Sequence, residues 1–136
     1  MVISTRGRNA LRLMLDIAQQ PGESPVSLSS VSERQLISTK YLEQIVSPLV
    51  KAGLLTSVRG ANGGYLLARP AEQITTGDIL RTGEGNLAPV ACLLTDEECP
   101  RASACDTLPF WKGLDDAITA YIDSVTLADL VEGGAV

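Results

Sequence analysis

The sequence predicts a mainly α-helical fold with a small β-hairpin: a winged helix-turn-helix domain plus a long C-terminal dimerisation helix. Three observations predict it: apolar stripes at helical spacing in the first fifty residues, a glycine-rich turn between two short strand-like runs, and one long amphipathic stretch near the C-terminus. The 136 residues are 45% apolar and 4% aromatic, which suffices for one domain with a mostly aliphatic core. We expect a winged helix-turn-helix at 1–83, a cysteine-containing loop at 84–106, and a helix with its tail at 107–136.

Three helices are predicted in the first half of the chain. The first spans residues 5–19, and either Ser4 or Thr5 can cap its N-terminus. A second, short helix follows Ser27, and a third follows Ser38, which is a suitable capping residue. The apolar residues of these segments fall at helical spacing. They are Ala10, Leu13, Met14, Ile17 and Ala18, then Leu28 and Val31, then Leu42, Ile45, Val46, Leu49 and Val50.

Pro48 interrupts the third predicted helix. Proline has no amide hydrogen and its ring clashes with the carbonyl four residues earlier, here that of Gln44, so we expect a kink or an early loosening. Gly53 is the expected C-terminal cap. The first turns of the helix lie before the kink and remain regular.

A hairpin is predicted directly after this helix. Strands at 54–59 and 65–68 flank the turn Gly60-Ala61-Asn62-Gly63-Gly64, whose glycines supply the positive φ angles that a tight tip needs. A short helix is expected to begin at Thr76. The sequence therefore has the helix, helix, hairpin order of a winged helix-turn-helix.

The C-terminal half begins with an irregular stretch and continues with a long helix. Residues 84–106 show no helical or strand period, and an irregular segment of that length in a compact domain is usually functional or disordered. The long helix begins near 107–109 with Pro109 in its first turn, and Thr126 caps a final short turn at 127–131. Its apolar face is formed by Phe110, Leu114, Ala117, Ile118, Tyr121, Ile122 and Val125.

Charge is distributed unevenly between the two halves. The net charge is −5, yet residues 1–69 hold eight Lys/Arg and four Asp/Glu, while residues 70–136 hold three basic and twelve acidic residues. A basic half can meet phosphate while an acidic half faces away. An ordinary solvated surface whose charges happen to be unevenly distributed would give the same numbers, so charge alone does not decide whether the protein binds DNA.

The third helix and the hairpin tip carry side chains suited to reading DNA. Glutamine pairs with adenine, glutamate accepts from cytosine, lysine meets guanine or phosphate, and an arginine beside glycine on a slim tip can enter a minor groove. The candidates are Ser38, Thr39, Lys40, Tyr41, Glu43 and Gln44 on the helix, and Arg59 and Gly60 on the wing. The alternative is that these are only a solvated helix face and a hairpin turn.

Six motifs, in order along essentially the whole chain, resemble a family of small winged-helix repressors that includes the iron–sulfur cluster regulator IscR, NsrR and CymR. They are Ser4-Thr5-Arg6-Gly7-Arg8, Ser32-Glu33-Arg34-Gln35, Tyr41-Leu42-Glu43-Gln44, Val58-Arg59-Gly60, Gly63-Gly64-Tyr65-Leu66-Leu67 and Thr126-Leu127. The resemblance implies a palindromic operator in double-stranded DNA, base reading by Glu43 and Gln44, and a wing contact by Arg59. It further implies that the residue matching Glu43 discriminates operator classes. It also implies a homodimer joined through the long helix, at Phe110, Leu114, Ile118, Tyr121, Ile122 and Val125.

Three cysteines, Cys92, Cys99 and Cys105, are the only cysteines of the chain, which has no histidine. Clustered thiols suit an iron–sulfur cluster or zinc, and in a reducing cytoplasm they are more often ligands or redox groups than structural disulfides. Three thiolates permit either common cluster, and we favour [2Fe–2S] over [4Fe–4S]. A zinc site or a thiol-redox switch is the alternative.

A fourth ligand for such a cluster is not evident. IscR-like proteins have a histidine where this chain has Leu108, and NsrR-like proteins have a carboxylate where it has Arg8; neither residue can bind the cluster. Asp106 is a weak candidate because it adjoins Cys105. The acidic run at 96–98, a hydroxyl of Ser4 or Thr5, and an exogenous molecule remain open, and loop solubility explains the acids equally well.

Other functions fit the sequence poorly. Without a histidine base or a phosphate-binding loop, an enzyme is not expected. No apolar run is long enough to span a bilayer and the N-terminus lacks a signal peptide's apolar stretch, so we expect a cytoplasmic protein without membrane contact. A thiol carrier in cluster assembly would leave the basic half unexplained. The cluster-assembly machinery remains a candidate partner of the regulator.

Overall fold

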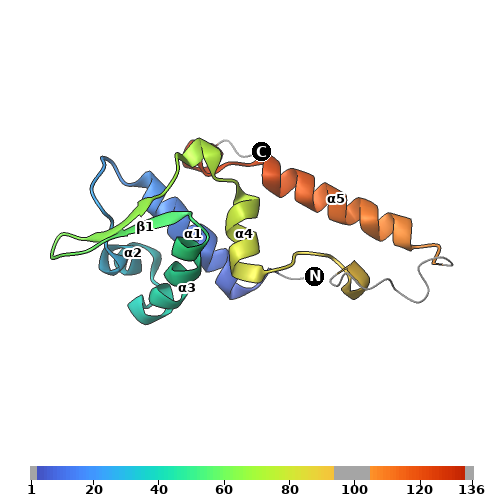
Figure 1. The fold of residues 1–136 in the computed structure, drawn as a ribbon, viewed down its shortest axis with the longest axis horizontal. Coiled ribbons are helices and arrows are strands. Elements are labelled where there is room, and N and C mark those ends of the chain that lie inside the picture. Colours follow the sequence, from blue (N-terminus) through green and yellow to red (C-terminus); the bar gives the residue numbers. More distant parts are fainter. Residues whose placement is uncertain (1–2, 94–104, 134–136) are drawn as a thin grey trace.

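A computed structural model of the chain describes residues 3–93 and 105–133. Its helices and strands follow the predicted order. They are α1 (Thr5–Gln19), α2 (Leu28–Gln35), α3 (Thr39–Lys51), β1 (Leu55–Val58), β2 (Gly64–Leu67), α4 (Thr76–Glu84), α5 (Leu108–Ser124) and α6 (Leu127–Val131), with 3₁₀ turns η1 (Ala71–Gln73) and η2 (Ala91–Leu93). Figure 1 shows α1 to α4 and the hairpin gathered in one body, from which α5 projects as an arm.

Serine and threonine side chains fix where the helices begin. Ser4, Ser27 and Ser38 each accept a hydrogen bond from the backbone N–H three residues later, at 3.2 to 3.3 Å. Thr126 does the same for α6, at 3.1 Å. Each such cap contributes about 1 kcal/mol. The predicted caps are therefore confirmed, and α1 takes Ser4 in preference to Thr5.

Pro48 does not end α3, which runs on to Lys51. The Pro48 carbonyl still accepts a hydrogen bond from the Ala52 N–H at 2.9 Å, so the last turn remains closed. Gly53 then adopts φ +77°, in the left-handed region where glycine is favoured, and the chain turns into β1. The helix is therefore longer than the position of its proline alone suggests.

The core lies where α1, α2, α3 and α4 meet beneath the hairpin. Its residues are almost all aliphatic, and the largest are fully enclosed. They include Leu13, Met14, Val31, Leu42, Leu49, Leu54, Leu55, Ile74, Ile79 and Leu127, each no more than 2% exposed. Full burial of one such side chain is worth about 1.5 to 3 kcal/mol, so this cluster holds the helix-turn-helix against the hairpin.

The hairpin is anchored at its base by the α1–α2 connection. Ser57 faces Tyr65 across the two antiparallel strands. Tyr65 also exchanges two backbone hydrogen bonds of 2.9 Å with Val26, so this connection lies beside β2 like a third strand. A Cβ on Gly64 would fall within 2.5 Å of the Val26 carbonyl carbon, so only glycine permits this approach.

The arm formed by α5 is attached to the body at its C-terminal end. The Thr76 N–H donates to the Val125 carbonyl and the Leu127 N–H to the Ile74 carbonyl, both at 2.8 Å. Ile122 and Val125 are buried there, within their own protomer. The opposite end of α5 is far from the body in Figure 1.

The predicted interface residues of α5 differ in exposure. Phe110, near the N-terminal end, is 63% exposed, and Tyr121, near the C-terminal end, is 59% exposed, while Leu114 and Ile118 are half-buried. The predicted dimerisation residues therefore divide into two buried at the attachment and four that remain partly or largely accessible. In the part of the chain that the structure describes, no helix is both long and apolar enough to cross a membrane.

Candidate nucleic-acid interface and cysteine region

A buried carboxylate fixes the helix-turn-helix against α1. Asp16, 1% exposed, accepts hydrogen bonds from Arg34 at 2.7 to 3.1 Å and from the Gln35 side chain at 2.9 Å. Burial of Asp16 acts to raise its pKa, but the hydrogen bonds from Arg34 and Gln35 outweigh it, and its pKa lies below the ordinary value. The same contact raises the pKa of Arg34. Asp16 therefore remains ionised and holds α2 in place.

The turn between α2 and α3 is unusual at Leu36. This residue adopts φ +57° and ψ +44°, and among the residues that the structure describes it is the one non-glycine residue with a positive φ. Its side chain is 90% exposed. Arg12 supports the turn by donating to the carbonyl and the side-chain oxygen of Gln35. The turn thus delivers the chain to Ser38 at the start of α3 without burying Leu36.

The predicted base-reading residues lie together on the N-terminal turns of α3. The side chains of Ser38, Thr39, Lys40, Glu43 and Gln44 are exposed. Tyr41 differs, because it is half-buried and packs against the core. An exposed helix face with these donors and acceptors can present them to base edges in a major groove.

The wing brings two further predicted residues to the surface. Arg59 and Gly60 are exposed at the end of β1, and Gly60 adopts φ +112°. The Gly63 N–H closes the turn on the Gly60 carbonyl at 3.0 Å. The wing therefore presents its arginine on a narrow tip, as the minor-groove hypothesis requires.

A groove of about 330 Å³ separates α3 from the hairpin. Its floor is formed by Val46 and Val50. The remaining lining residues are Glu43, Ser47, Lys51, Ser57 and Tyr65. Sequence reasoning missed this groove, although the spacing of four between Glu43, Ser47 and Lys51 already places them on one helix face.

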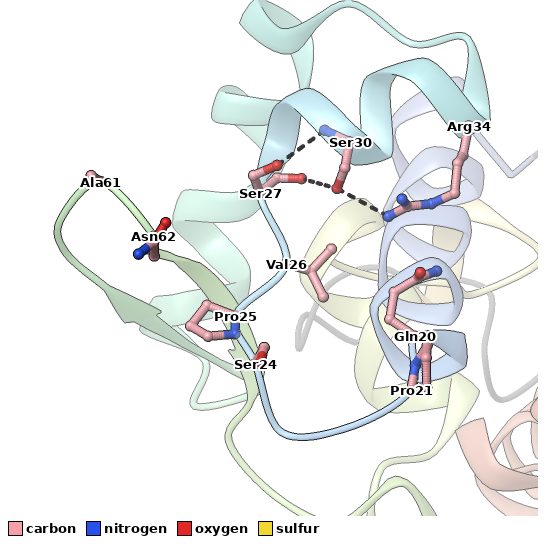
Figure 2. A pocket seen from close by; sticks show the side chains of 11 residues that line it. Gln20, Pro21, Ser24, Pro25, Val26, Ser27, Ser30, Arg34, Ala61 and Asn62 are labelled. Carbon is pink, nitrogen blue, oxygen red and sulfur yellow. Dashed lines mark hydrogen bonds between the residues drawn. The ribbon is translucent and has the colours of Figure 1, made fainter.

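A second cavity, of about 470 Å³, lies between the start of α2 and the wing tip (Figure 2). Ser27, Ser30 and Arg34 line one side of it, and Asn62 approaches from the wing. The Arg34 guanidinium donates to the Ser30 hydroxyl at 3.1 Å, and its charge is already balanced by Asp16. This cavity therefore offers a neutralised cation.

The unpaired cations are concentrated in the N-terminal half. Within the described ranges, the ion pairs join Arg34 to Asp16, Arg69 to Asp78 and Arg81 to Asp123. The remaining basic residues of residues 3–69 belong to no ion pair there. They are Arg6, Arg8, Arg12, Lys40, Lys51 and Arg59. Uncompensated positive charge on the face of α3 and the wing is what association with phosphate requires.

The predicted metal-binding residues fall partly outside the described part of the chain. Cys92 is exposed in η2, and Cys105 is half-buried before α5, with its sulfur 3.4 Å from the Thr107 hydroxyl. Asp106 is exposed, and Cys99 lies outside the described residues. Within residues 3–93 and 105–133, no three Cys, Asp or Glu side chains lie close enough together to hold a metal ion. Two of the three thiols are therefore located, one in η2 and one shortly before α5.

The comparison with known proteins decides the family. Residues 3–133 match the family model Rrf2, described as an iron-dependent transcriptional regulator. The chain belongs to the Rrf2 family. The predicted resemblance and the winged helix-turn-helix fold are thereby confirmed, and the chain is a DNA-binding transcription regulator whose relatives are regulators rather than enzymes.

The relatives of this Rrf2 protein include both CymR and IscR regulators. The regulator CymR of Bacillus subtilis is 44% identical over 130 residues, covering 96% of this chain and 89% of CymR. The regulator IscR of Serratia proteamaculans is 40% identical over 131 residues, covering 96% and 79%. Among solved structures, CymR, the global cysteine regulator of B. subtilis, superimposes with a TM-score of 0.80 at 42% identity and 97% coverage of both chains. The structure of T. potens IscR gives 0.78 at 41% identity, with 98% and 88% coverage.

Proposed function

We propose that this Rrf2 protein is a homodimer that binds a palindromic operator and whose binding is controlled by an iron–sulfur cluster held by Cys92, Cys99 and Cys105. The observation that carries the DNA-binding part is the exposed polar face of α3 beside a wing that ends in Arg59. In this proposal Ser38, Lys40, Glu43 and Gln44 meet base edges or nearby phosphates in the major groove. Arg59 enters the adjacent minor groove.

The accessible part of the apolar face of α5 supports the proposed dimerisation through this helix. Phe110 and Tyr121 expose most of their surface, and large aromatic side chains are enriched in protein interfaces. A homodimer with two recognition helices would impose two-fold symmetry on the DNA site, with half-sites about one helical turn apart. Ile122 and Val125, which are buried in the protomer, would hold α5 to its own body.

The cysteine donor set fits a soft metal centre in its chemistry. Thiolates are the usual ligands of iron–sulfur clusters, and such a cluster would supply a redox-active, oxygen-sensitive group beside the DNA-binding half. Cys92, Cys99 and Cys105 would hold it, and Asp106 remains a weak candidate for a fourth ligand. The family description as iron-dependent and the IscR relatives support this proposal. We favour [2Fe–2S] over [4Fe–4S].

A second candidate is a regulator in which the same cysteines bind zinc or act as a redox switch. The observation that favours it is the similarity to CymR, described as a cysteine regulator and solved from Staphylococcus aureus also in an oxidised form. Cys92 is an exposed thiol and is therefore accessible to oxidants. Both candidates use the same DNA-binding surface.

Iron and acid-labile sulfide per monomer, measured together with the visible spectrum after anaerobic purification, separate the two candidates. Equal iron and sulfide with thiolate-to-iron absorbance supports the cluster, and the stoichiometry gives its type. Protein that stays colourless after anaerobic reconstitution contradicts the cluster and favours zinc or a thiol switch. Equal operator affinity for loaded and unloaded protein, across several operators, would exclude cluster control even if a cluster binds.

A further inference from the structure

We infer that the groove between α3 and the hairpin seats one sugar–phosphate strand of the operator, with Lys51 and the hydroxyls of Ser47, Ser57 and Tyr65 binding a single phosphate region. This inference rests on the proposed placement of α3 and the wing on DNA. It adds a contact that fixes the position of the protein on the duplex without reading its sequence.

The route of the backbone follows from the shape of B-DNA. Adjacent major and minor grooves are separated by one sugar–phosphate strand. If α3 occupies a major groove and Arg59 reaches the neighbouring minor groove, that strand must pass between the helix and the wing. The space available there is the groove of about 330 Å³.

One wall of this groove is a single face of α3. Glu43, Ser47 and Lys51 are spaced by four residues, so they follow one another along the helix, and all three side chains are exposed. Glu43 lies among the base-reading residues, and Lys51 lies two turns further on. The wall therefore changes from negative to positive away from the bases, so a phosphate would lie at the end formed by Ser47 and Lys51.

The opposite wall comes from a cross-strand pair of the hairpin. Ser57 and Tyr65 are directly opposite each other in the ladder, so their side chains emerge on one face of the sheet. Both line the groove, as do the valines of its floor. Their hydroxyl groups can donate to phosphate oxygens, and the apolar floor can accommodate the sugar.

The charge of Lys51 is available for this contact. Lys51 belongs to none of the ion pairs formed within residues 3–93 and 105–133. The larger cavity beside α2 is a weaker candidate for a phosphate, because the guanidinium of Arg34 is already paired with Asp16 at 2.7 Å. The groove at α3 therefore combines position, hydroxyl donors and an uncompensated cation.

The test measures binding to a duplex that wild-type protein selects from a random-sequence pool, as a function of salt. The variants are Lys51→Gln and Ser57→Ala, with Lys112→Gln on α5 as the matched surface-lysine control. For a dimer that loses two phosphate contacts, Lys51→Gln should reduce the steepness of the negative slope of log K against log salt by about 1.8. Binding at 0.15 M salt is then roughly 30-fold weaker, and the difference vanishes near 1 M. Ser57→Ala should weaken binding roughly ten-fold without changing the slope, because a neutral donor releases no counterion.

A methylphosphonate scan of the selected duplex identifies the contact. One neutralised phosphate per half-site should weaken wild-type binding but leave Lys51→Gln binding nearly unchanged. Sequence preference should be the same for wild type and Lys51→Gln. Thermal unfolding checks that each variant is folded.

Failure of this inference can be told apart from failure of the proposed function. If wild-type protein retains no duplex from the pool, the operator-binding proposal itself is overturned. If wild type binds and Glu43→Ala alters base preference, while Lys51→Gln behaves like Lys112→Gln, only the phosphate seat is overturned. If Lys51→Gln changes the salt dependence but no single methylphosphonate abolishes that difference, the proposed phosphate contact is also overturned, because the overall positive charge of the DNA-binding half would then explain the effect.

Discussion

Replacement of Leu36 by glycine should stabilise the protein. Leu36 holds φ +57° with its side chain 90% exposed, so the substitution removes almost no buried surface. A left-handed conformation costs an L-residue about 1 to 2 kcal/mol, whereas glycine adopts it freely. Glycine also gives the unfolded chain more conformational freedom, which offsets roughly 0.5 to 1 kcal/mol of the relieved backbone strain. The free energy of unfolding should therefore rise by roughly 0.5 to 1 kcal/mol.

Thermal and urea unfolding measure this effect. For a chain of this length the gain corresponds to an increase in Tm of about 2 to 4 °C. Leu36→Ala is the control: it removes the exposed side chain but keeps the Cβ, so the backbone strain persists and no stabilisation is expected. If Leu36→Gly is destabilised, or if Leu36→Ala is stabilised equally, backbone strain is not the reason, and the side chain must matter through a contact or through solubility.

Three further substitutions test contacts described above. Asp16→Asn should lower stability at pH 7 by about 2 kcal/mol, below the 3 to 5 kcal/mol typical of a buried pair because the Arg34 side chain is 37% exposed. Because the folded-state pKa of Asp16 is lowered, its ionisation stabilises the fold at pH values above the ordinary pKa of 3.8. This contribution disappears as the pH falls through the lower folded-state pKa. Urea unfolding at a series of pH values should therefore show the free energy of unfolding of the wild type approaching that of the variant in acid. Gly64→Ala should lower stability by about 1 to 3 kcal/mol, because a Cβ there meets the Val26 carbonyl. Thr126→Ala should cost about 1 kcal/mol by removing the cap of α6.

Matched substitutions keep these expectations specific. Gly113→Ala, where a Cβ has no neighbour within 4 Å, should not destabilise α5, in contrast to Gly64→Ala. Thr119→Ala is the control for Thr126→Ala, since Thr119 is an exposed residue within α5. Equal effects within either pair would contradict the reasoning. An Asp16→Asn variant as stable as wild type at pH 7 would show that the pair with Arg34 contributes nothing measurable.

Local signals in the sequence were sufficient to predict most of the fold. Helix starts depend on a side chain and an amide three residues apart, so Ser27 and Ser38 could be recognised without tertiary information. The apolar stripes of α1 and α3 likewise determine which faces are buried. Pro48 lies inside α3, which continues to Lys51 as the apolar stripe and Gly53 predict, and the kink expected at Pro48 stays a prediction.

Features that depend on distant parts of the chain could not be predicted in this way. Asp16 and Arg34 are 18 residues apart, and nothing local marks either as a partner of the other. The left-handed turn at Leu36 carries no glycine to signal it. The groove beside α3 exists only because the hairpin folds back on the helix. Of the predicted cysteine site, Cys99 lies outside the described residues, and the ligand set stays a prediction.

The attachment of α5 at one end has a mechanical consequence. The helix has 17 residues, so it extends about 25 Å from the hydrogen bonds that tie Thr76 and Val125 together. Because the helix is attached at one end, a tilt of about 5° at the attachment moves its far end by about 2 Å over this length. In a dimer joined through these helices, the same tilt alters the separation of the two recognition helices, which DNA tolerates only near one helical repeat. A small rearrangement near Cys105, at the end of α5 farthest from the attachment, would therefore change the separation of the two recognition helices. It would leave the side chains of each recognition helix unchanged.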